Sequence, residues 1–183
     1  DEEGRLVVYG SVQNPLGLVK DIAACLALDE DKVRVVIRPN GGAFGGREEP
    51  SVHIQAALGT LLTGRPVRMV FSREELNIFS TKRHAMELRY KLGATKDGKL
   101  MAIKAETIGD TGPYDSSGEY VLFRACVFGA GPYEIPNAWM DSYAVYTNNA
   151  NAASMRGFGS TQPCLAMEAM LDRVAEACNI DPF

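Results

Sequence analysis

Two glycine-rich stretches constrain this chain most, because each joins a strand-like run to a helix-like run. The first is Arg38-Pro39-Asn40-Gly41-Gly42-Ala43-Phe44-Gly45-Gly46-Arg47-Glu48, and the second is Arg156-Gly157-Phe158-Gly159-Ser160. Each places an aromatic ring among glycines just before an expected helix N-terminus. Backbone N–H groups in such a loop approach an anion closely, and the helix dipole favours negative charge there. The two loops together predict a large phosphate-bearing ligand that is held from two sides.

Each stretch also has a purely structural interpretation. The first could be a flexible connection, although four glycines in six positions cost considerable chain entropy. In the second, Arg156 could pair with a carboxylate while the two glycines make a turn. The first stretch lacks the G-x-G-x-x-G spacing of a dinucleotide fingerprint and the Gly-Lys-Ser/Thr of a P-loop. Neither common phosphate-binding motif therefore explains it.

The first part of the chain alternates strands and helices. Asn14-Pro15 supplies a cap and a first helical position for an amphipathic helix. A second helix is expected from about Pro50 to Thr63, with Gly64 as its stop, and a short helix is expected to begin near Ser72. Apolar and β-branched runs predict the strands, at residues 6–11, 33–37 and 67–71.

The later part is dominated by a hairpin. Apolar residues alternate from Met86 to Leu92, Asp97-Gly98 supplies the turn, and residues 100–107 form the returning strand. A loop is expected at 109–118, a helix at 120–129, a strand at 142–147 and a helix at 163–178. This order predicts an α+β fold with mixed sheets, internally duplicated strand–glycine loop–helix units and two lobes of about 1–80 and 81–183.

Composition narrows the class of partner. The 183 residues carry a net charge of −4, and the arginines are scattered, so a nucleic-acid surface is not expected. The four cysteines form no C-x-x-C pair and are expected to be reduced and mostly buried. No apolar run is long enough to span a bilayer, which together with reduced cysteines predicts a cytoplasmic protein. The missing initiator Met suggests a piece of something longer.

The motifs in this order resemble the large, molybdenum-binding subunit of the xanthine dehydrogenase/aldehyde oxidase family. The resemblance covers nearly the whole chain: the Val12-Gln13-Asn14-Pro15 loop, the Gly41 to Glu48 loop, Gly131-Pro132-Tyr133 through Asn137, and Arg156-Gly157-Phe158-Gly159 through Glu168. The first glycine motif followed by Arg47-Glu48 is highly specific. Its combination with the second motif leaves little room for coincidence.

The resemblance implies a role for each matching residue. Gln13 matches a glutamine that hydrogen-bonds an oxo ligand of molybdenum, although Gln13 could instead cap its own loop. Glu48 matches a glutamate that binds and polarises substrate. Arg124 matches a substrate-facing arginine of purine-oxidising members, or is an arginine on a helix surface. Gln13, Glu48 and Arg124 are therefore the candidate catalytic residues.

The cofactor-binding residues follow from the same resemblance. Phe44 and Gly45, with Gly42 beside them, match backbone that approaches the metal centre, and no residue here is expected to ligate the metal directly. Phe158 matches a ring that sandwiches a flat substrate, which makes it substrate-binding together with Glu48 and Arg124. The residues expected to contact the pterin are Arg156, Gly157, Phe158 and Gly159.

The resemblance implies a molybdopterin cofactor, as Mo-molybdopterin or its cytosine dinucleotide, with 2Fe-2S clusters and FAD on other domains or subunits. The family's catalytic base is a glutamate far beyond residue 183, so the fragment alone is expected to be inactive. The full enzyme is expected to hydroxylate an aromatic N-heterocycle such as a purine. The alternatives are an aldehyde or carbon monoxide dehydrogenase of the same family, a non-catalytic module for a phosphate ligand, and a structural interaction domain.

Overall fold

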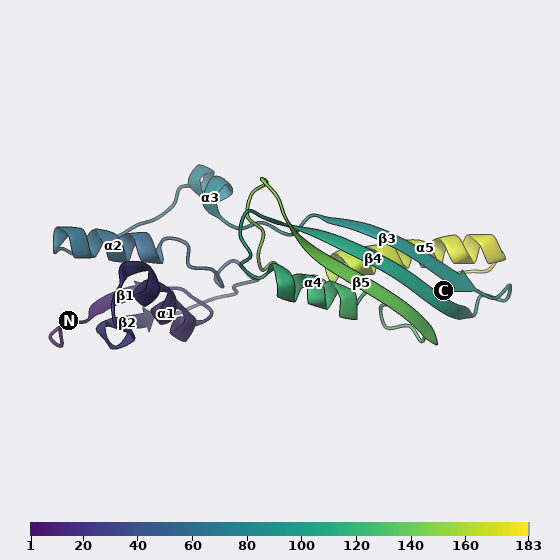
Figure 1. Ribbon diagram of the computed structural model, residues 1–183, viewed down its shortest axis with the longest axis horizontal. Coiled ribbons are helices and arrows are strands. Elements are labelled where there is room, and N and C mark those ends of the chain that lie inside the picture. Colours follow the sequence, from purple (N-terminus) through teal and green to yellow (C-terminus); the bar gives the residue numbers. More distant parts are fainter. Residues whose placement is uncertain (183) are drawn as a thin grey trace. The chain divides into compact units, whose positions relative to one another are not determined.

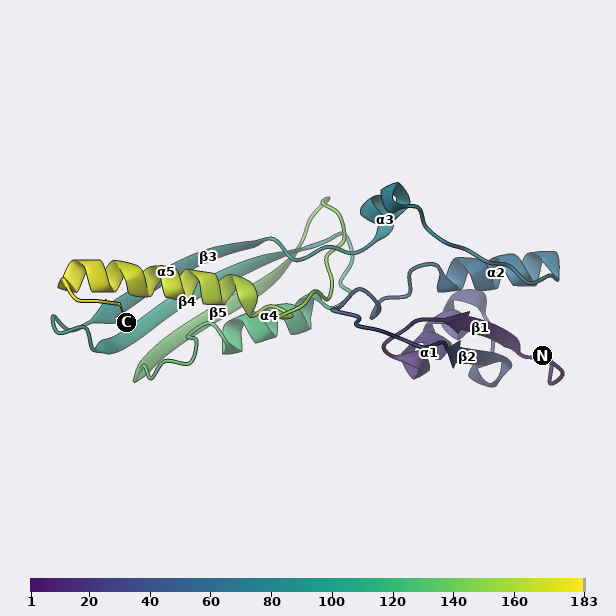
Figure 2. The ribbon, with the colours of Figure 1, turned by 180° about the vertical axis from the view of Figure 1, so that it is seen from behind.

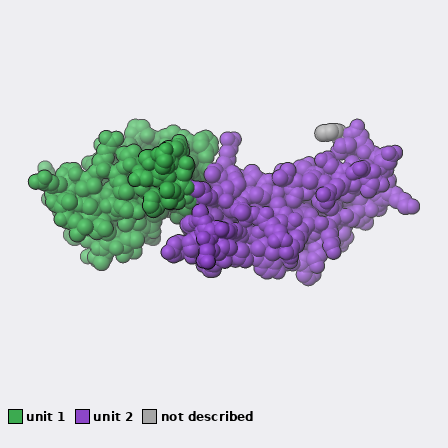
Figure 3. Space-filling model, turned by 90° about the horizontal axis from the view of Figure 1, so that it is seen from above, with its two compact units in different colours: residues 1–81 green, residues 82–183 purple. Residues whose placement is uncertain are grey.

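The computed structural model describes residues 1–182. It divides into two compact units, unit 1 from Asp1 to Thr81 and unit 2 from Lys82 onward (Figure 3). Unit 1 contains a two-stranded sheet and helices, and unit 2 contains a three-stranded sheet and two helices (Figure 1). The architecture is α+β with mixed sheets, which confirms the fold class expected from the sequence.

Unit 1 is built on a short parallel strand pair. Its elements are β1 (Leu6–Gly10), α1 (Pro15–Leu26), a 3-10 turn at Glu30–Lys32, β2 (Val33–Ile37), α2 (His53–Thr63) and α3 (Arg73–Phe79). The register of β1 and β2 runs from Leu6 opposite Val33 to Gly10 opposite Ile37. The parallel arrangement follows from the intervening helix, because a crossover is needed to return the chain in the same direction.

Helix α1 begins as the sequence predicts. The Asn14 side chain accepts a hydrogen bond from the Gly17 N–H at 2.9 Å, and Pro15 occupies the first turn. The helix ends at Ala27, which takes a left-handed conformation. Its apolar face and the two strands bury one core, together with Ala57 of α2; the core consists of Val8, Val12, Leu18, Ile22, Ala23, Val33 and Ala57.

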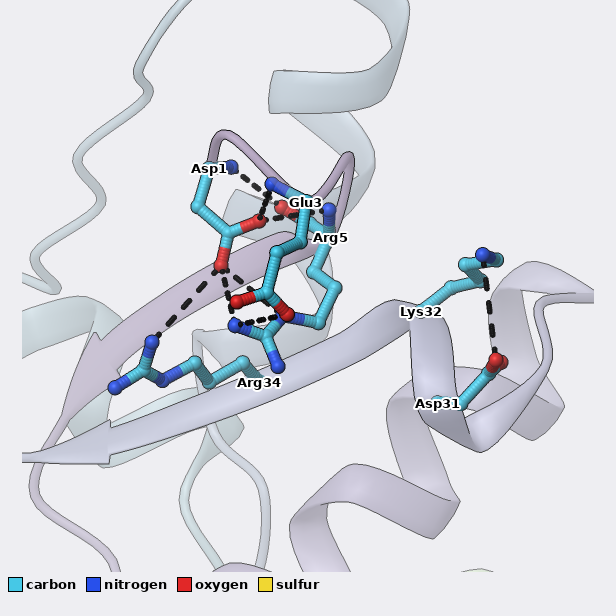
Figure 4. Close-up of polar contacts among 6 residues, drawn as sticks. All are labelled: Asp1, Glu3, Arg5, Asp31, Lys32 and Arg34. Carbon is cyan, nitrogen blue, oxygen red and sulfur yellow. Dashed lines mark hydrogen bonds and ion pairs between the residues drawn. The ribbon is translucent and has the colours of Figure 1, made fainter.

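Arginines and carboxylates connect the starts of β1 and β2 (Figure 4). The Asp1 carboxylate lies 3.0 Å from the Arg5 guanidinium and 4.0 Å from that of Arg34, which stands on β2. Glu3 adds a second contact to Arg5 at 2.9 Å. These side chains are partly exposed to solvent, so each pair contributes at most about 1 kcal/mol to stability.

Unit 2 contains the predicted hairpin and a third strand. Its elements are β3 (Met86–Ala94), β4 (Leu100–Gly112), α4 (Gly118–Val127), β5 (Asn137–Tyr146) and α5 (Thr161–Cys178). Strand β4 lies in the centre, antiparallel to β3 and parallel to β5. Gly98, at φ +85°, closes the hairpin turn. Helix α4 packs against β4 and β5, and α5 runs along β3 (Figure 2).

Alternate residues of β4 explain how the helices pack on the sheet. One face of the strand is buried from Ile103 through Ala105 and Thr107 to Thr111, whereas most residues between them are more exposed. Gly109 lies on the buried face, where a Cβ would meet Leu122 of α4 at 2.6 Å. The absent side chain therefore lets α4 approach the centre of the sheet.

Several local expectations are wrong. Residues 67–71 belong to no strand, because a strand requires a partner for its ladder. Helix α2 begins at His53 rather than near Pro50, with Val52 as its N-cap residue. Residues 109–112, expected in a loop, extend β4 between β3 and β5.

Another wrong expectation concerns the cysteines. All four are free, but Cys25 and Cys164 are exposed, while Cys126 and Cys178 are partly buried. The expectation of mostly buried thiols is therefore wrong. Cys25 and Cys164 lie on faces of α1 and α5 that do not contribute to a core.

Candidate functional site

The candidate residues of unit 1 gather where β1 and the first glycine loop end. The Gln13 N–H donates to the Arg47 carbonyl at 2.8 Å, which ties the loop after β1 to the residues just before Glu48. The Gln13 side chain is exposed and Glu48 is half-buried. The Arg47 guanidinium donates to the Asn40 side chain, so the two ends of the glycine loop are also held together.

A tight turn forms the centre of this loop. The Gly46 N–H donates to the Ala43 carbonyl at 2.9 Å, and the two central residues, Phe44 and Gly45, have φ values of +52° and +94°. Positive φ at both central positions is typical of a type I′ turn. Phenylalanine is uncommon there, because a Cβ raises the energy of the left-handed region.

The Phe44 ring explains one of the neighbouring glycines. A Cβ at Gly42 would lie 2.5 Å from the ring, so the ring folds back over bare backbone. Phe44 itself remains 62% exposed. By contrast, a Cβ at Gly41 would meet no atom within 4 Å, so the backbone beside the turn stays open to a ligand.

The second glycine loop repeats the turn in unit 2. The Ser160 N–H donates to the Gly157 carbonyl at 3.1 Å, and Phe158 and Gly159 have φ values of +46° and +95°. A Cβ at Gly159 would lie 2.1 Å from the Val121 carbonyl oxygen of α4. Gly159 therefore has a packing requirement of its own, because only bare backbone fits against that helix.

Arg124 meets the second loop from α4. Its guanidinium carbon lies 5.8 Å from the centre of the Phe158 ring and 5.4 Å from that of Phe128. These distances are typical of cation–π contacts, and Arg124 is exposed while Phe158 is half-buried. The structure thus brings together two of the predicted substrate-binding residues, and both have one side open to solvent.

Two side chains that the sequence did not reveal hold the second loop in place. Arg83 donates to the Arg156 carbonyl at 2.7 Å and to the Thr161 hydroxyl at 2.9 Å. The Gln162 amide donates to the His84 carbonyl at 2.9 Å. These pairs are 73 to 78 residues apart, so no local pattern signals them. The adjacent His84 ring is buried, and this desolvation lowers its pKa.

The two loops differ in the structure on their C-terminal side. The second loop leads directly into α5, whose N-cap residue is Ser160. Residues 47–52 separate the first loop from α2, so the expectation that it opens a helix is wrong. The two glycine loops are therefore most similar in the turn itself, and only the second turn lies next to the N-terminus of a helix and its dipole.

Each unit carries groups that fit oxygen-rich ligands. In unit 1 these are the exposed Gln13 amide and the open backbone at Gly41, and in unit 2 the N-terminus of α5 favours an anion. Among residues 1–182, no three His, Cys, Asp or Glu side chains form a group that could bind a metal ion. Within the same residues, no helix combines the length and hydropathy needed to cross a bilayer.

Known proteins are similar to this chain over its full length. The molybdopterin cofactor-binding domain model matches residues 1–183. The nicotinate dehydrogenase large molybdopterin subunit of Eubacterium barkeri is 45% identical over the whole chain, which covers 43% of that subunit. A probable xanthine dehydrogenase subunit of Bacillus subtilis is 37% identical, again over the whole chain, which covers 25% of that protein.

A solved structure agrees with these matches. The aldehyde oxidoreductase of Desulfovibrio gigas superimposes with a TM-score of 0.93 over the whole chain, at 29% identity, and the match covers 20% of that protein. The chain therefore spans less than half of the length of each of these relatives. The chain belongs to the molybdopterin cofactor-binding domain family of xanthine dehydrogenase and aldehyde oxidase large subunits.

Proposed function

We propose that this chain forms part of the molybdopterin pocket of a hydroxylase that oxidises an aromatic N-heterocycle, with water as the oxygen source. The observation that carries the substrate class is the Arg124–Phe158 pair. A flat ring can stack on Phe158, while the guanidinium binds an oxygen or nitrogen on its edge. The relatives named for nicotinate and xanthine, both aromatic N-heterocycles, support this choice.

The proposed roles of the other residues follow the turn geometry. The Gln13 amide hydrogen-bonds an oxygen of the cofactor, and the backbone at Gly42, Phe44 and Gly45 approaches the same centre. Glu48 orients the substrate through a hydrogen bond. Once bound, the cofactor supplies the redox chemistry, and the protein supplies position and hydrogen bonds.

The second loop is proposed to hold the organic part of the cofactor. Its contacts come from the Arg156 side chain and from backbone at Gly157, Phe158 and Gly159, next to the α5 N-terminus. Because Gly159 is also required for packing on α4, its substitution would disturb both roles. The pterin is either Mo-molybdopterin or its cytosine dinucleotide form.

The remainder of the enzyme is proposed to lie outside residues 1–183. It includes the catalytic glutamate, and 2Fe-2S and FAD groups on other domains or subunits of a cytoplasmic complex. The chain alone is accordingly expected to be inactive. An aldehyde dehydrogenase is the second candidate, because an aldehyde oxidoreductase shares the fold at a TM-score of 0.93.

The test uses Arg124→Gln in the full-length complex, with Arg173→Gln on exposed α5 surface as the matched control. A charged hydrogen bond contributes about 1.5–3 kcal/mol, so kcat/KM for nicotinate or xanthine should fall by about 10- to 150-fold. Turnover of an uncharged aromatic aldehyde should change little, and the molybdenum and pterin contents should not change. Equal losses for heterocycle and aldehyde would contradict the role of Arg124, and a matured complex without molybdenum would contradict the hydroxylase itself.

A further inference from the structure

Unit 1 contains a cavity of about 1180 Å³ beside β1. One wall consists of consecutive residues from Leu6 to Ser11, and a second wall of consecutive residues from Gly64 to Met69. Helix α2 contributes a third wall through His53, Ala57 and Thr60. Consecutive strand residues point alternately to opposite faces, so a cavity lined by every one of them faces a backbone edge.

The edge of β1 that faces the cavity has identifiable hydrogen-bonding groups. The Gly10 carbonyl accepts from the Arg38 N–H at 3.1 Å and therefore points toward β2. The N–H and C=O of one strand residue point to the same edge, and successive residues alternate. Val7 and Tyr9 consequently direct their backbone groups away from β2. No strand within residues 1–182 pairs with that edge.

The second wall leads into a segment with the sequence of a strand. Four of the five residues from Val67 to Phe71 are apolar, with Arg68 as the exception, and a short apolar run of this kind is consistent with a buried strand. Val67 packs against α2, because a Cβ at Gly59 would lie 3.3 Å from its Cγ1. The segment nevertheless has no ladder partner among the described residues, and Val67 and Met69 remain 39% and 36% exposed.

We propose that the cavity receives an additional β-strand from a part of the same subunit that lies outside residues 1–183. This strand pairs with β1 on one side and with Val67–Phe71 on the other, which completes a four-stranded sheet. The occupant is assigned to the same subunit because more than half of each matched relative lies outside the aligned region. The assignment does not depend on the substrate.

The cavity lining specifies the side chains of this strand. Its α2 wall presents Ala56 and Ala57, so small or medium apolar residues should face that helix at every second position. Five arginines line the cavity against two carboxylates, so the other positions should include an acidic residue; the lining charges are Arg5, Arg38, Arg47, Arg65, Arg68, Asp1 and Glu49. His53 also lines it, and its buried Nδ1 has no hydrogen-bond partner among residues 1–182.

Amide hydrogen exchange on the full-length subunit in its complex tests the pairing. The Val7 and Tyr9 amides, together with alternate amides of Val67–Phe71, should exchange at least about 100-fold slower than their intrinsic rates, as expected of paired strands. The Leu62 amide in α2 serves as a reference for ordinary helical protection. Exchange of Val7 and Tyr9 at nearly intrinsic rates would overturn the proposal.

Photo-crosslinking identifies the occupant. A photo-reactive amino acid in place of Arg68, which lines the cavity, should capture a segment beyond residues 1–183 of the same subunit, with apolar residues at alternate positions and at least one acid. The same substitution at Leu62, which is 79% exposed and outside the lining, should not capture it. Capture of a different subunit, or only of residues within 1–183, would overturn the assignment of the occupant.

Discussion

Replacement of Gly159 by alanine tests how tightly the second glycine loop packs on α4. The backbone of Gly159 has φ +95°, where a residue with a Cβ is strained by about 1–2 kcal/mol. The added Cβ would also lie 2.1 Å from the Val121 carbonyl oxygen, well inside the usual C···O distance of about 3.3 Å. Such overpacking costs about 1–3 kcal/mol, so the free energy of unfolding should fall by roughly 2–5 kcal/mol.

The measurement is urea denaturation followed through Trp139, the chain's single tryptophan, which lies on β5 in the same unit. Gly131→Ala is the control for strain, because Gly131 has φ +65° and its new Cβ would meet a Tyr133 side-chain atom at 3.0 Å, not a backbone atom. It should cost about 1–2 kcal/mol.

A second control measures the effect of replacing a glycine where the new Cβ causes neither backbone strain nor a clash. At Gly93 the nearest atom to a new Cβ is the Ala102 carbonyl oxygen at 3.8 Å, and φ is not positive. Gly93→Ala should therefore leave stability unchanged or raise it by about 0.5–1 kcal/mol. If Gly159→Ala changed the free energy of unfolding no more than Gly93→Ala does, the loop could not be pressed against α4, and the argument for its packing would fail.

Three further predictions concern groups around the sheet of unit 2. Arg83→Gln removes two hydrogen bonds to the second loop, which should lower the free energy of opening the loop by about 1–2 kcal/mol. Limited proteolysis near Arg156 should therefore accelerate about 5- to 30-fold. Arg83→Lys should not restore both bonds. Hydrogen bonds from Thr147, Asn149 and Gly112 lower the pKa of Asp110 below 3.8. The ionised Asp110 therefore contributes fully to folding stability above that pH, and the contribution is lost as the pH falls further. Asp110→Asn should flatten the acid limb of a plot of the free energy of unfolding against pH. Burial raises the pKa of Tyr90 to about 12. The contribution of its neutral phenol to folding stability is therefore complete below pH 10 and is lost between pH 10 and 12. Tyr90→Phe should abolish this alkaline loss of stability, and it should remove the last-ionising phenol from a spectrophotometric titration.

The parts of this fold that the sequence predicts well are those set by neighbouring residues. Asn14 and Pro15 fix the start of α1, and Asp97-Gly98 fixes the hairpin turn between β3 and β4. Each depends on a cap or a turn that a few adjacent residues form without help from the rest of the chain. Their boundaries in the structure agree closely with the predicted ones.

The parts that the sequence misses depend on distant partners. Residues 67–71 have the apolar composition of a strand, but composition does not supply a partner strand, and no ladder forms within residues 1–182. In the candidate site, the glycine–phenylalanine pattern predicts the two glycine loops, but not the tight turn at the centre of each. It does not reveal Arg83, which reaches the second loop across 73 residues, or the contact of Gly159 with Val121.

The two turns share a backbone but use their phenylalanines differently. In each turn a phenylalanine takes a left-handed conformation that costs about 1–2 kcal/mol, which glycine would avoid. Packing offsets part of that conformational energy at Phe158, because its half-buried ring contacts Arg124. The Phe44 ring instead covers Gly42 and remains 62% exposed. Strained residues of this kind concentrate at binding sites, so the left-handed phenylalanine in each turn favours a ligand contact at both loops.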